Sequence, residues 1–411
     1  MIKNVYLTEL NEKDCCGCTA CANACPVDAI EMATLNKAGF WYPKLKYDKC
    51  IHCGKCAKVC PMNIMQAQCN KDGKIYTFLS GDTANWLRSA SGGAFYDICK
   101  VLSDNHPIYY GAIWDGLKVR IDSAESLQEI KKFQKSKYVE AQIGDNVFKQ
   151  IKKQLDIGHF VVFSGTPCMI AGLKLYLGKE YDNLITIDFV CHGKGAPGVF
   201  DAWISSLNNR FGKKVTEFSF REKKFIGDHV NSNCCSYTFE DGRKKIVTRD
   251  PYHHTYVNGL IMRCSCIDCR FAIKRYSDLT LADLKNQSVV LKRPNKQRTY
   301  STIMVNSING EKIIEKIKKT ECEITEIPRE IIEKYNPKIC KVLAGNPKRN
   351  EFMELFEKSE GDIYKLIKKY SGVYPSEWGE YNLSNKSYKI LSRPLRFMDA
   401  VVRLLRKSKY Q

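Results

Sequence analysis

Eight cysteines near the start of the chain fall into two runs with the same spacing, each followed by proline. The first run is Cys15, Cys18, Cys21 and Cys25, and the second is Cys50, Cys53, Cys56 and Cys60. Three thiolates at this spacing in a tight loop can bind one iron-sulfur cubane, and the fourth cysteine of each run binds the other cubane. The spacing therefore predicts two [4Fe-4S] clusters. One is assigned to Cys15, Cys18, Cys21 and Cys60, and the other to Cys50, Cys53, Cys56 and Cys25.

Zinc and disulfides are the alternative uses of so many cysteines. Zinc sites usually combine two C-x2–4-C pairs without a trailing Cys-Pro. Disulfide scaffolds are typical of short secreted chains, whereas this chain has 411 residues and starts with charged residues rather than an apolar segment. No apolar run approaches the length of a membrane span. We therefore expect a cytoplasmic protein that transfers single electrons.

The formal net charge of +20 counts every cysteine as neutral. Each oxidised cluster with its four thiolates carries −2, so two clusters leave a charge of about +16. The lysines are scattered and no nucleic-acid-binding motif is present, so we expect no nucleic-acid partner. The positive charge suits an anionic cofactor or an acidic redox partner, although a solvated lysine-rich surface is the simpler explanation.

The hydrophobic pattern predicts an α+β multidomain chain, in which a ferredoxin-like domain with two [4Fe-4S] clusters precedes a mixed α/β domain. Short strands at 29–32 and 39–43 flank a turn between the cysteine runs, and residues 67–88 are interpreted as a polar connector. Strands are expected at 108–114, 117–121, 160–164 and 184–190, with helices at 147–155, 169–177 and from 197. This alternation is typical of a partly parallel sheet, which binds ligands at the carboxyl ends of its strands.

The second half contains further elements and a basic tail. Strands are expected at 215–221, 235–240, 244–248, 277–283 and 300–306, and helices at 310–319 and 348–370. The predicted divisions are 1–66, 67–150, 151–355 and a helical, basic segment at 356–411. Residues 393–407 can form a basic amphipathic helix, which would allow peripheral membrane contact. A terminal helix docked on the protein, or a frayed tail, explains the same pattern more simply.

Four other cysteines lie where a metal site could form. Cys168 and Cys191 follow two predicted strands, and Cys266 and Cys269 form a C-x2-C pair. They could converge on an iron-sulfur cluster or on zinc, or Cys168 and Cys191 could be buried apolar residues. Cys264 is a spare candidate ligand. The remaining cysteines have no assigned role: Cys16, Cys69, Cys99, Cys234, Cys235, Cys322 and Cys340.

A loop rich in serine and glycine leads into a predicted helix at 95–102. It contains Ser89, Ser91, Gly92 and Gly93. Free backbone N–H groups in such a loop, together with a helix N-terminus, can bind an anion. Ser-Gly-Gly is also an ordinary turn and helix cap, so the pattern alone leaves both interpretations open.

From the two cysteine runs to about residue 355, the chain resembles the beta subunits of coenzyme F420 hydrogenases and dehydrogenases. The stretches that carry the resemblance are 89–93, 136–139, 163–168, 190–193, 265–269, 277–280 and 335–337. The resemblance implies a flavoprotein that binds FAD beside a third [4Fe-4S] cluster at Cys168, Cys191, Cys266 and Cys269. It implies that the flavin is contacted by the Ser89–Gly93 loop, Lys137, Tyr138, Gly165 and Thr166.

The resemblance also implies an oxidoreductase that passes electrons between its clusters and a flavin. The flavin would exchange hydride with coenzyme F420, NAD(P)H or another carrier. A ferredoxin or a partner subunit would exchange single electrons with the clusters. Similar proteins accompany surface-polysaccharide genes, so a role in surface-polysaccharide biosynthesis is implied as well. His192 is our candidate general acid, although a structural, hydrogen-bonded histidine fits the same position.

The chain departs from the family pattern at two places, Ala282–Asn286 and the residues around Thr299. Glycines expected there are absent, so the flavin pocket is expected to differ. Two other functions therefore stay open. One is an electron-relay subunit of a larger complex with no substrate of its own. The other is an α/β domain that has lost its flavin and binds a nucleotide-sugar or another partner.

Overall fold

The structure is a computed structural model that describes residues 4–64, 73–144, 146–226, 229–295, 297–342 and 345–373. The basic tail at 393–407 and Cys69 lie outside these residues, so the expectations for them are untested. Among the described residues, no helix is long and apolar enough to cross a membrane.

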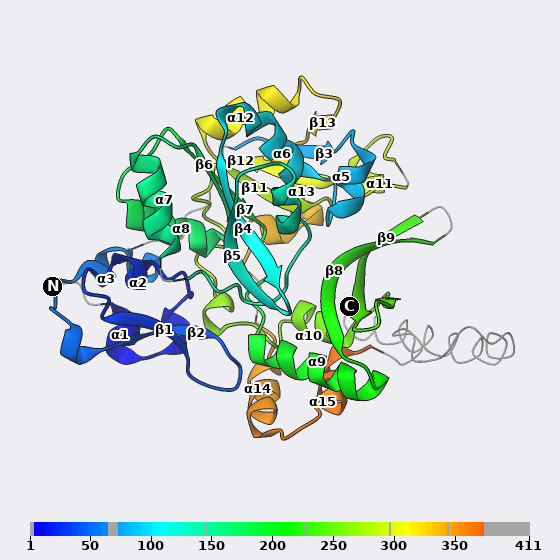
Figure 1. The fold of residues 1–411 in the computed structure, drawn as a ribbon. Helices are drawn as coiled ribbons and strands as arrows, with labels where there is room; N and C mark the ends of the chain where they lie inside the picture. The colour runs from blue at the N-terminus through cyan, green and yellow to red at the C-terminus, as the bar shows by residue number, and fades with distance from the viewer. Residues whose placement is uncertain are drawn as a thin grey trace, which may run out of the picture.

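The N-terminal module consists of short elements around the two cysteine runs (Figure 1). They are α1 (Val5–Glu9), η1 (Glu12–Asp14), α2 (Ala20–Ala24), β1 (Ile30–Thr34), β2 (Trp41–Leu45), η2 (Tyr47–Lys49), α3 (Lys55–Lys58) and α4 (Pro61–Ile64). The antiparallel pair β1 and β2 lies between the runs, which confirms the predicted strands. Left-handed backbone recurs at matching positions, with φ of 62° at Gly17 and 54° at His52. The two cysteine loops therefore share a conformation as well as a spacing.

An eight-stranded mixed sheet forms the largest part of the chain. Its order is β13-β3-β12-β11-β7-β6-β4-β5. The strands are β3 (Ile75–Leu79), β4 (Ile108–Asp115), β5 (Lys118–Ala124), β6 (Val161–Ser164), β7 (Leu184–Phe189), β11 (Leu279–Asp283), β12 (Ser301–Val305) and β13 (Glu323–Glu326). The four central strands β4, β6, β7 and β11 are parallel, and the strands on either side of them pair antiparallel. The mixed α/β architecture predicted from the hydrophobic pattern is thus confirmed.

Strand β3 corrects one sequence prediction. Residues 67–88 were expected to be a polar connector, but Ile75–Leu79 is buried along its whole length and pairs with β12 and β13. Five residues are too few for a clear periodicity, and the strand is buried throughout because both of its faces are covered. Its position next to a polar segment therefore hid a strand of the large sheet.

Helices and short helical turns flank the sheet. They are α5 (Thr83–Arg88), α6 (Ala94–Leu102), η3 (Ser103–Asn105), η4 (Glu129–Phe133), α7 (Val147–Asp156), α8 (Pro167–Leu177), α11 (Gln287–Val290), α12 (Ile308–Ile317), α13 (Arg329–Tyr335) and η6 (Pro337–Ile339). Helix α8 begins directly after β6 with proline at its first turn, a position that needs no N–H donor. The loop between β6 and α8 therefore lies at the carboxyl edge of the parallel strands.

A smaller three-stranded sheet and four helices complete the described chain. The elements are α9 (Pro197–Phe211), β8 (Val215–Ile226), β9 (His229–Phe239), β10 (Lys244–Val247), α10 (Pro251–Val257), η5 (Cys264–Cys266), α14 (Arg349–Lys358) and α15 (Tyr364–Ser371). The predicted helix at 348–370 is interrupted between α14 and α15, where Gly361 adopts a left-handed φ of 72°. Figure 1 shows β8 and β9 as a long curved hairpin beside the large sheet.

The N-terminal module packs against both sheets rather than standing apart. Tyr6, Phe40 and Tyr42 share a hydrophobic core with residues of α9, while Cys18 and Ala20 share another with α8. In Figure 1 the module lies directly beneath α7 and α8. This shared packing fixes the cysteine loops against the carboxyl edge of the parallel strands.

Gly172 of α8 lets the first cysteine loop approach this closely. A Cβ atom at this position would lie 2.9 Å from the Cys18 Sγ. We expect Gly172→Val to lower the free energy of unfolding by about 2 kcal/mol through overpacking and to reduce the iron content. Leu175→Val places a β-branched side chain at a half-buried position of the same helix and serves as the control. Equal denaturant midpoints for the two variants would contradict the close packing.

Candidate functional site

Cysteines of the two runs lie near one another in the N-terminal module. Cys21 lies near Cys15, Cys60 and Cys56, and burial together with these neighbouring thiols raises its pKa. In the other group, burial and the nearby Cys53, Cys25 and Cys50 raise the pKa of Cys56. Thiols that disfavour one another's ionisation in this way are expected to be stabilised as thiolates by a bound cationic iron-sulfur core.

Solvent reaches the two groups to different extents. Cys18 and Cys21 of the first group are buried, whereas Cys53 of the second is exposed together with Ile51 and His52. Backbone N–H groups also donate to the sulfurs, from Gly17 to Cys15 at 3.4 Å and from Ala29 to Cys25 at 3.2 Å. Solvent exposure and N–H···S hydrogen bonds are two of the factors that set cluster potentials. The groups are therefore expected to differ in potential.

The other four candidate cysteines converge at the carboxyl edge of the large sheet. Cys191 lies close to Cys266, Cys168 and Cys269, and burial followed by these thiols raises its pKa. Cys168 follows β6, Cys191 follows β7, and the other two belong to the segment around η5. Cys264 is directed elsewhere: its Sγ lies 3.3 Å from Glu12 Oε2 and 3.3 Å from an Arg349 nitrogen. Cys264 is therefore not part of this group.

This second constellation lies beside the first cysteine loop. The Cys168 Sγ is 4.0 Å from the Cys16 carbonyl oxygen, and the Cys16 and Cys168 thiols contact each other. Among the described residues, no three His, Cys, Asp or Glu side chains are placed to hold a single metal ion. Cys168 therefore lies directly beside the loop of the first cysteine run.

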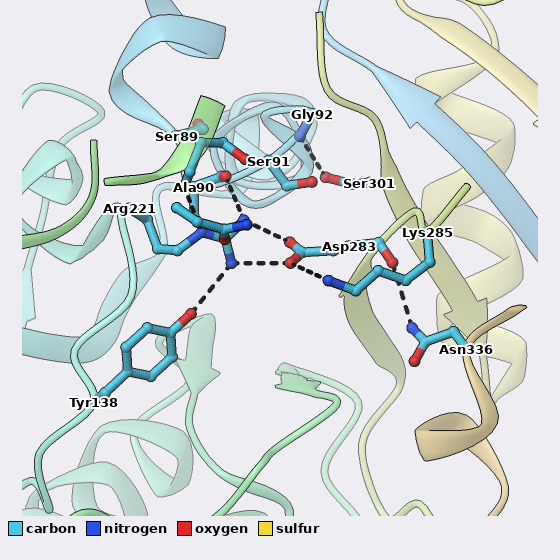
Figure 2. A network of polar contacts seen from close by, with 12 residues as sticks. Ser89, Ala90, Ser91, Gly92, Tyr138, Arg221, Asp283, Lys285, Ser301 and Asn336 are labelled. Carbon is cyan, nitrogen blue, oxygen red and sulfur yellow. Dashed lines mark hydrogen bonds and ion pairs between the residues drawn. The ribbon is translucent and has the colours of Figure 1, made fainter. Parts of the chain in front are cut away.

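A buried arginine connects the Ser89–Gly93 loop to the sheets (Figure 2). Arg221 of β8 donates to the Ala90 carbonyl at 2.9 Å and to the Tyr138 hydroxyl at 3.2 Å, and it pairs with Asp283 at 2.9 Å. Its backbone has a φ of 63°, an uncommon conformation for a residue with a side chain. Lys285 lies 3.6 Å from the same carboxylate. Sequence analysis missed Arg221 because a lone Arg in a strand carries no motif.

The Ser89–Gly93 loop itself is tightly packed. The Gly92 N–H donates to the Ser301 hydroxyl at 2.8 Å, and Lys223 donates to the carbonyls of Ser89 and Ser91. A Cβ at Gly92 would lie 2.3 Å from the Phe78 carbonyl, so glycine is required here by the packing of strands β3 and β12. The Gly92 N–H therefore has a partner within the chain. Positive charge near this loop comes from Arg221 and Lys223 instead.

Lys137 and Tyr138 have structural partners. Lys137 donates to the carbonyls of Lys132, Phe133 and Gln134 at the end of η4, and burial, with a smaller effect from Lys135, lowers its pKa to about 7. Tyr138 stacks on His253 at a ring distance of 5.1 Å and on Tyr256 at 4.7 Å. The Lys137 side chain caps a helical turn, and the Tyr138 hydroxyl faces Arg221.

The loop after β6 joins the cysteine site to the sheet. The Gly165 N–H donates to the Ile187 carbonyl of β7 at 3.1 Å, and the Thr166 hydroxyl lies 3.1 Å from the Cys168 Sγ. The stretch Ser277–Thr280 also holds neighbouring strands together through hydrogen bonds. Asp278 accepts two hydrogen bonds from Thr186, from its N–H and its hydroxyl, both at 2.7 Å. These residues fix the strand ends that carry the cysteines.

His192 has partners on both ring nitrogens. Its Nε2 lies 2.8 Å from the Val257 carbonyl and its Nδ1 lies 2.5 Å from the Lys338 ammonium. Burial and the positive charge of Lys338 lower its pKa to about 4. The ring is therefore neutral near pH 7 and donates its proton to a carbonyl, which speaks against a role as general acid.

A buried histidine next to this site gives a pH-dependent stability. Burial, then neighbouring positive groups, lower the pKa of His253 to about 3, and its Nδ1 has no hydrogen-bond partner among the described residues. Its stabilising contribution is complete above the unfolded pKa of about 6.5 and decreases as the pH falls. We expect the contribution of His253 to the free energy of unfolding to fall by about 1.4 kcal/mol between pH 7.5 and 5.5. Urea denaturation of His253→Phe at both pH values should show a smaller loss than the native chain, and an unchanged loss would contradict the neutral, buried ring.

Two family models match parts of the chain. Residues 14–64 match the 4Fe-4S dicluster domain, and residues 159–342 match the C terminus of the coenzyme F420 hydrogenase/dehydrogenase beta subunit. Among solved structures, the chain is similar to one chain of the F420-reducing [NiFe] hydrogenase complex from Methanosarcina barkeri, studied by xenon derivatization. That match has 12% identity and a TM-score of 0.43, and covers 72% of this chain and 96% of the other. A search of curated proteins finds no match.

The dicluster domain and the beta-subunit match define the class of protein. The chain is an iron-sulfur electron-transfer oxidoreductase related to hydrogenase and dehydrogenase subunits. The two matches support the coenzyme F420 hydrogenase/dehydrogenase beta-subunit family, with an N-terminal 4Fe-4S dicluster domain.

Proposed function

We propose that the chain carries electrons between a one-electron partner and a flavin along three [4Fe-4S] clusters. The first cluster is assigned to Cys15, Cys18, Cys21 and Cys60, and the second to Cys50, Cys53, Cys56 and Cys25. The third is assigned to Cys168, Cys191, Cys266 and Cys269. The observation that carries the proposal is the convergence of these last four thiols directly beside the first cysteine loop.

The different burial of the three groups suggests a route. The second group has an exposed cysteine and is accessible to a partner protein, whereas the first group is buried against α8. The third group lies at the carboxyl edge of the parallel strands, where sheets of this kind bind ligands. Electrons would therefore enter or leave at the second cluster, pass through the first, and reach the third near the flavin site.

The residues near the Ser89–Gly93 loop fit an anionic cofactor such as FAD. Arg221, Lys223 and Lys285 lie beside Asp283, and Lys135 and Lys244 offset the neighbouring Glu222, so positive charge in excess suits a diphosphate. Two buried oxygens beside the loop, Gln134 Oε1 and Thr299 Oγ1, lack hydrogen-bond partners among the described residues. Buried polar atoms of this kind are expected to bond a bound ligand or water.

The protein's own residues would position and shield this cofactor. Arg221 and Lys223 hold the loop by its carbonyls, so their ammonium and guanidinium groups fix its shape as well as its charge. His192 follows Cys191 of the third cysteine group, and its Nδ1 contacts the Lys338 ammonium. Its ring proton is donated to the Val257 carbonyl. A bound flavin supplies the chemistry that clusters lack, because it exchanges two electrons with a hydride carrier and one at a time with clusters.

Anaerobic purification tests this proposal. Three clusters require about twelve irons per chain, with matching sulfide and stoichiometric FAD. A chain with zinc in place of iron, or with fewer than eight irons and no flavin absorbance, would contradict it. Parallel additions of reduced coenzyme F420, NADH, NADPH and reduced ferredoxin then identify the electron donor by flavin bleaching.

The same experiment separates the proposal from a pure relay subunit. Reduction of the flavin by an added hydride donor, in the isolated chain, is expected for an oxidoreductase with its own carrier. A chain that holds FAD but is reduced only through a partner subunit would instead be a relay. Absence of FAD from a chain with intact clusters would favour the third function, a site for another anionic ligand such as a nucleotide-sugar.

A further inference from the structure

Three buried ionisable side chains occupy the contact between the N-terminal module and the rest of the chain. Glu140, Lys194 and Arg263 are 3%, 4% and 0% exposed. Glu140 Oε1 lies 3.0 Å from the Arg263 guanidinium and 3.6 Å from the Lys194 ammonium. Two cations share one carboxylate, so this triad has a net charge of +1 away from water. Buried charge of this kind is costly unless an anion lies nearby to balance it.

The two cations of the triad face the first cysteine loop. The Lys194 ammonium donates to the carbonyls of Cys16 at 2.8 Å and Gly17 at 3.0 Å. The Arg263 Nε donates to the Cys15 carbonyl at 2.8 Å. The proposed first cluster, with its net negative charge, is the anion that these contacts bring next to the triad.

Lys194 also reaches the third cysteine group. Its backbone N–H donates to the Cys266 Sγ at 3.4 Å, three residues after Cys191 in the chain. One residue therefore touches the surroundings of two of the proposed clusters. Lysine at this position joins the two groups through hydrogen bonds at both ends.

No comparable buried cation faces the second cysteine group among the described residues. The lysines beside it, Lys49, Lys55 and Lys58, are exposed, so water and salt screen their charge. A charge in a buried, low-dielectric position acts more strongly on a neighbouring group than the same charge in solvent. Lys194 and Arg263 therefore stabilise an added electron on the first cluster more than the surface lysines do on the second.

We propose that the triad makes the first cluster easier to reduce than the second, so that electrons move inward from the exposed second cluster. In this step one electron leaves the reduced second cluster and enters the oxidised first cluster, and no bond or proton moves. The inference rests on the proposed function, because it requires that both clusters are present. It adds the residues that set the direction of transfer.

Two variants with opposite effects on charge test the inference. Lys194→Met removes the positive charge while Arg263 stays paired with Glu140, and it should lower the potential of the first cluster. Glu140→Gln removes the negative charge but keeps an oxygen acceptor for the Trp41 N–H, which donates to this side chain at 3.0 Å, and it should raise that potential. Each variant is expected to change the equilibrium constant for electron transfer between the two clusters about tenfold, which corresponds to a shift in potential of about 59 mV. Redox titration followed by electron paramagnetic resonance measures both.

Lys149→Gln is the matched control. Lys149 is half exposed and pairs with Asp28 of the N-terminal module at 2.9 Å, so its loss should leave all potentials unchanged. The inference is supported if the potential of the first cluster shifts in opposite directions in the two triad variants and both variants keep the iron content of the native chain. Unchanged potentials, or shifts of the same sign, overturn it, since a purely structural contact has no reason to respond to charge sign. If one variant fails to fold, the direction of the potential shift in the other variant still tests the inference. A native chain without iron would instead overturn the proposed function.

Discussion

Cys191→Ala should lower the iron content of the anaerobically purified chain from about twelve to about eight atoms. Cys191 is the residue whose thiol lies near all three other members of the third group, so its loss leaves that cluster with three ligands. The first two clusters should remain, because none of their assigned ligands is changed. Iron and sulfide analysis, with electron paramagnetic resonance of the reduced protein, measures this directly.

Cys99→Ala is the control for this experiment. Cys99 is a fully buried cysteine of α6, packed in the core of the large sheet among apolar residues. Its replacement should cost stability without changing the iron content. An unchanged iron content in Cys191→Ala, or an equal loss in both variants, would contradict the assignment of the third cluster.

Arg221→Met should destabilise the chain by about 3 kcal/mol and abolish binding of the proposed flavin. The guanidinium has three kinds of partner, the Asp283 carboxylate, the Tyr138 hydroxyl and the Ala90 carbonyl, and methionine satisfies none of them. The Asp283 carboxylate would keep Lys285, which is half exposed, and the Ser91 side chain, but it would lose its closest charged partner. Denaturant unfolding and flavin content report the two effects separately.

Two further variants separate the effect of Arg221 on stability from its effect on flavin binding. Arg243→Met breaks an exposed ion pair with Asp241 at the β9–β10 turn of the same small sheet, and should change stability by less than about 1 kcal/mol. Adding Asp283→Asn to Arg221→Met removes the unbalanced carboxylate and should recover part of the stability but not the flavin. A full recovery of flavin in the double variant would show that Arg221 acts on the fold alone.

Sequence analysis could predict a 4Fe-4S dicluster domain, which the match of residues 14–64 supports, because the cysteine spacing is itself the chemical requirement. Eight cysteines in two identical runs leave few alternatives, and the central strands β4, β6 and β7 are strongly apolar. Spacing alone does not predict that Cys168 and Cys191 converge with Cys266 and Cys269. Their convergence depends on parallel strands that end at the same edge of the sheet.

Other parts could not be predicted from sequence for physical reasons. Strand β3 is short and buried on both faces, so it has no periodicity to identify it. The roles of Glu140, Lys194 and Arg263 arise only when the N-terminal module packs against residues more than a hundred positions away. Gly92 looked like an anion-binding glycine, but the structure shows that packing against the Phe78 carbonyl and Ser301 requires it.

The central claim is a continuous electron path from the N-terminal clusters to a flavin through the third cysteine group. The most direct measurement adds reduced ferredoxin anaerobically to the flavin-loaded native chain and to Cys191→Ala, and follows flavin absorbance and cluster resonance together. We predict that the N-terminal clusters are reduced in both proteins, whereas the flavin bleaches only in the native chain. Equal bleaching of the flavin in both proteins, or a native flavin that stays oxidised while the N-terminal clusters are reduced, would contradict the path.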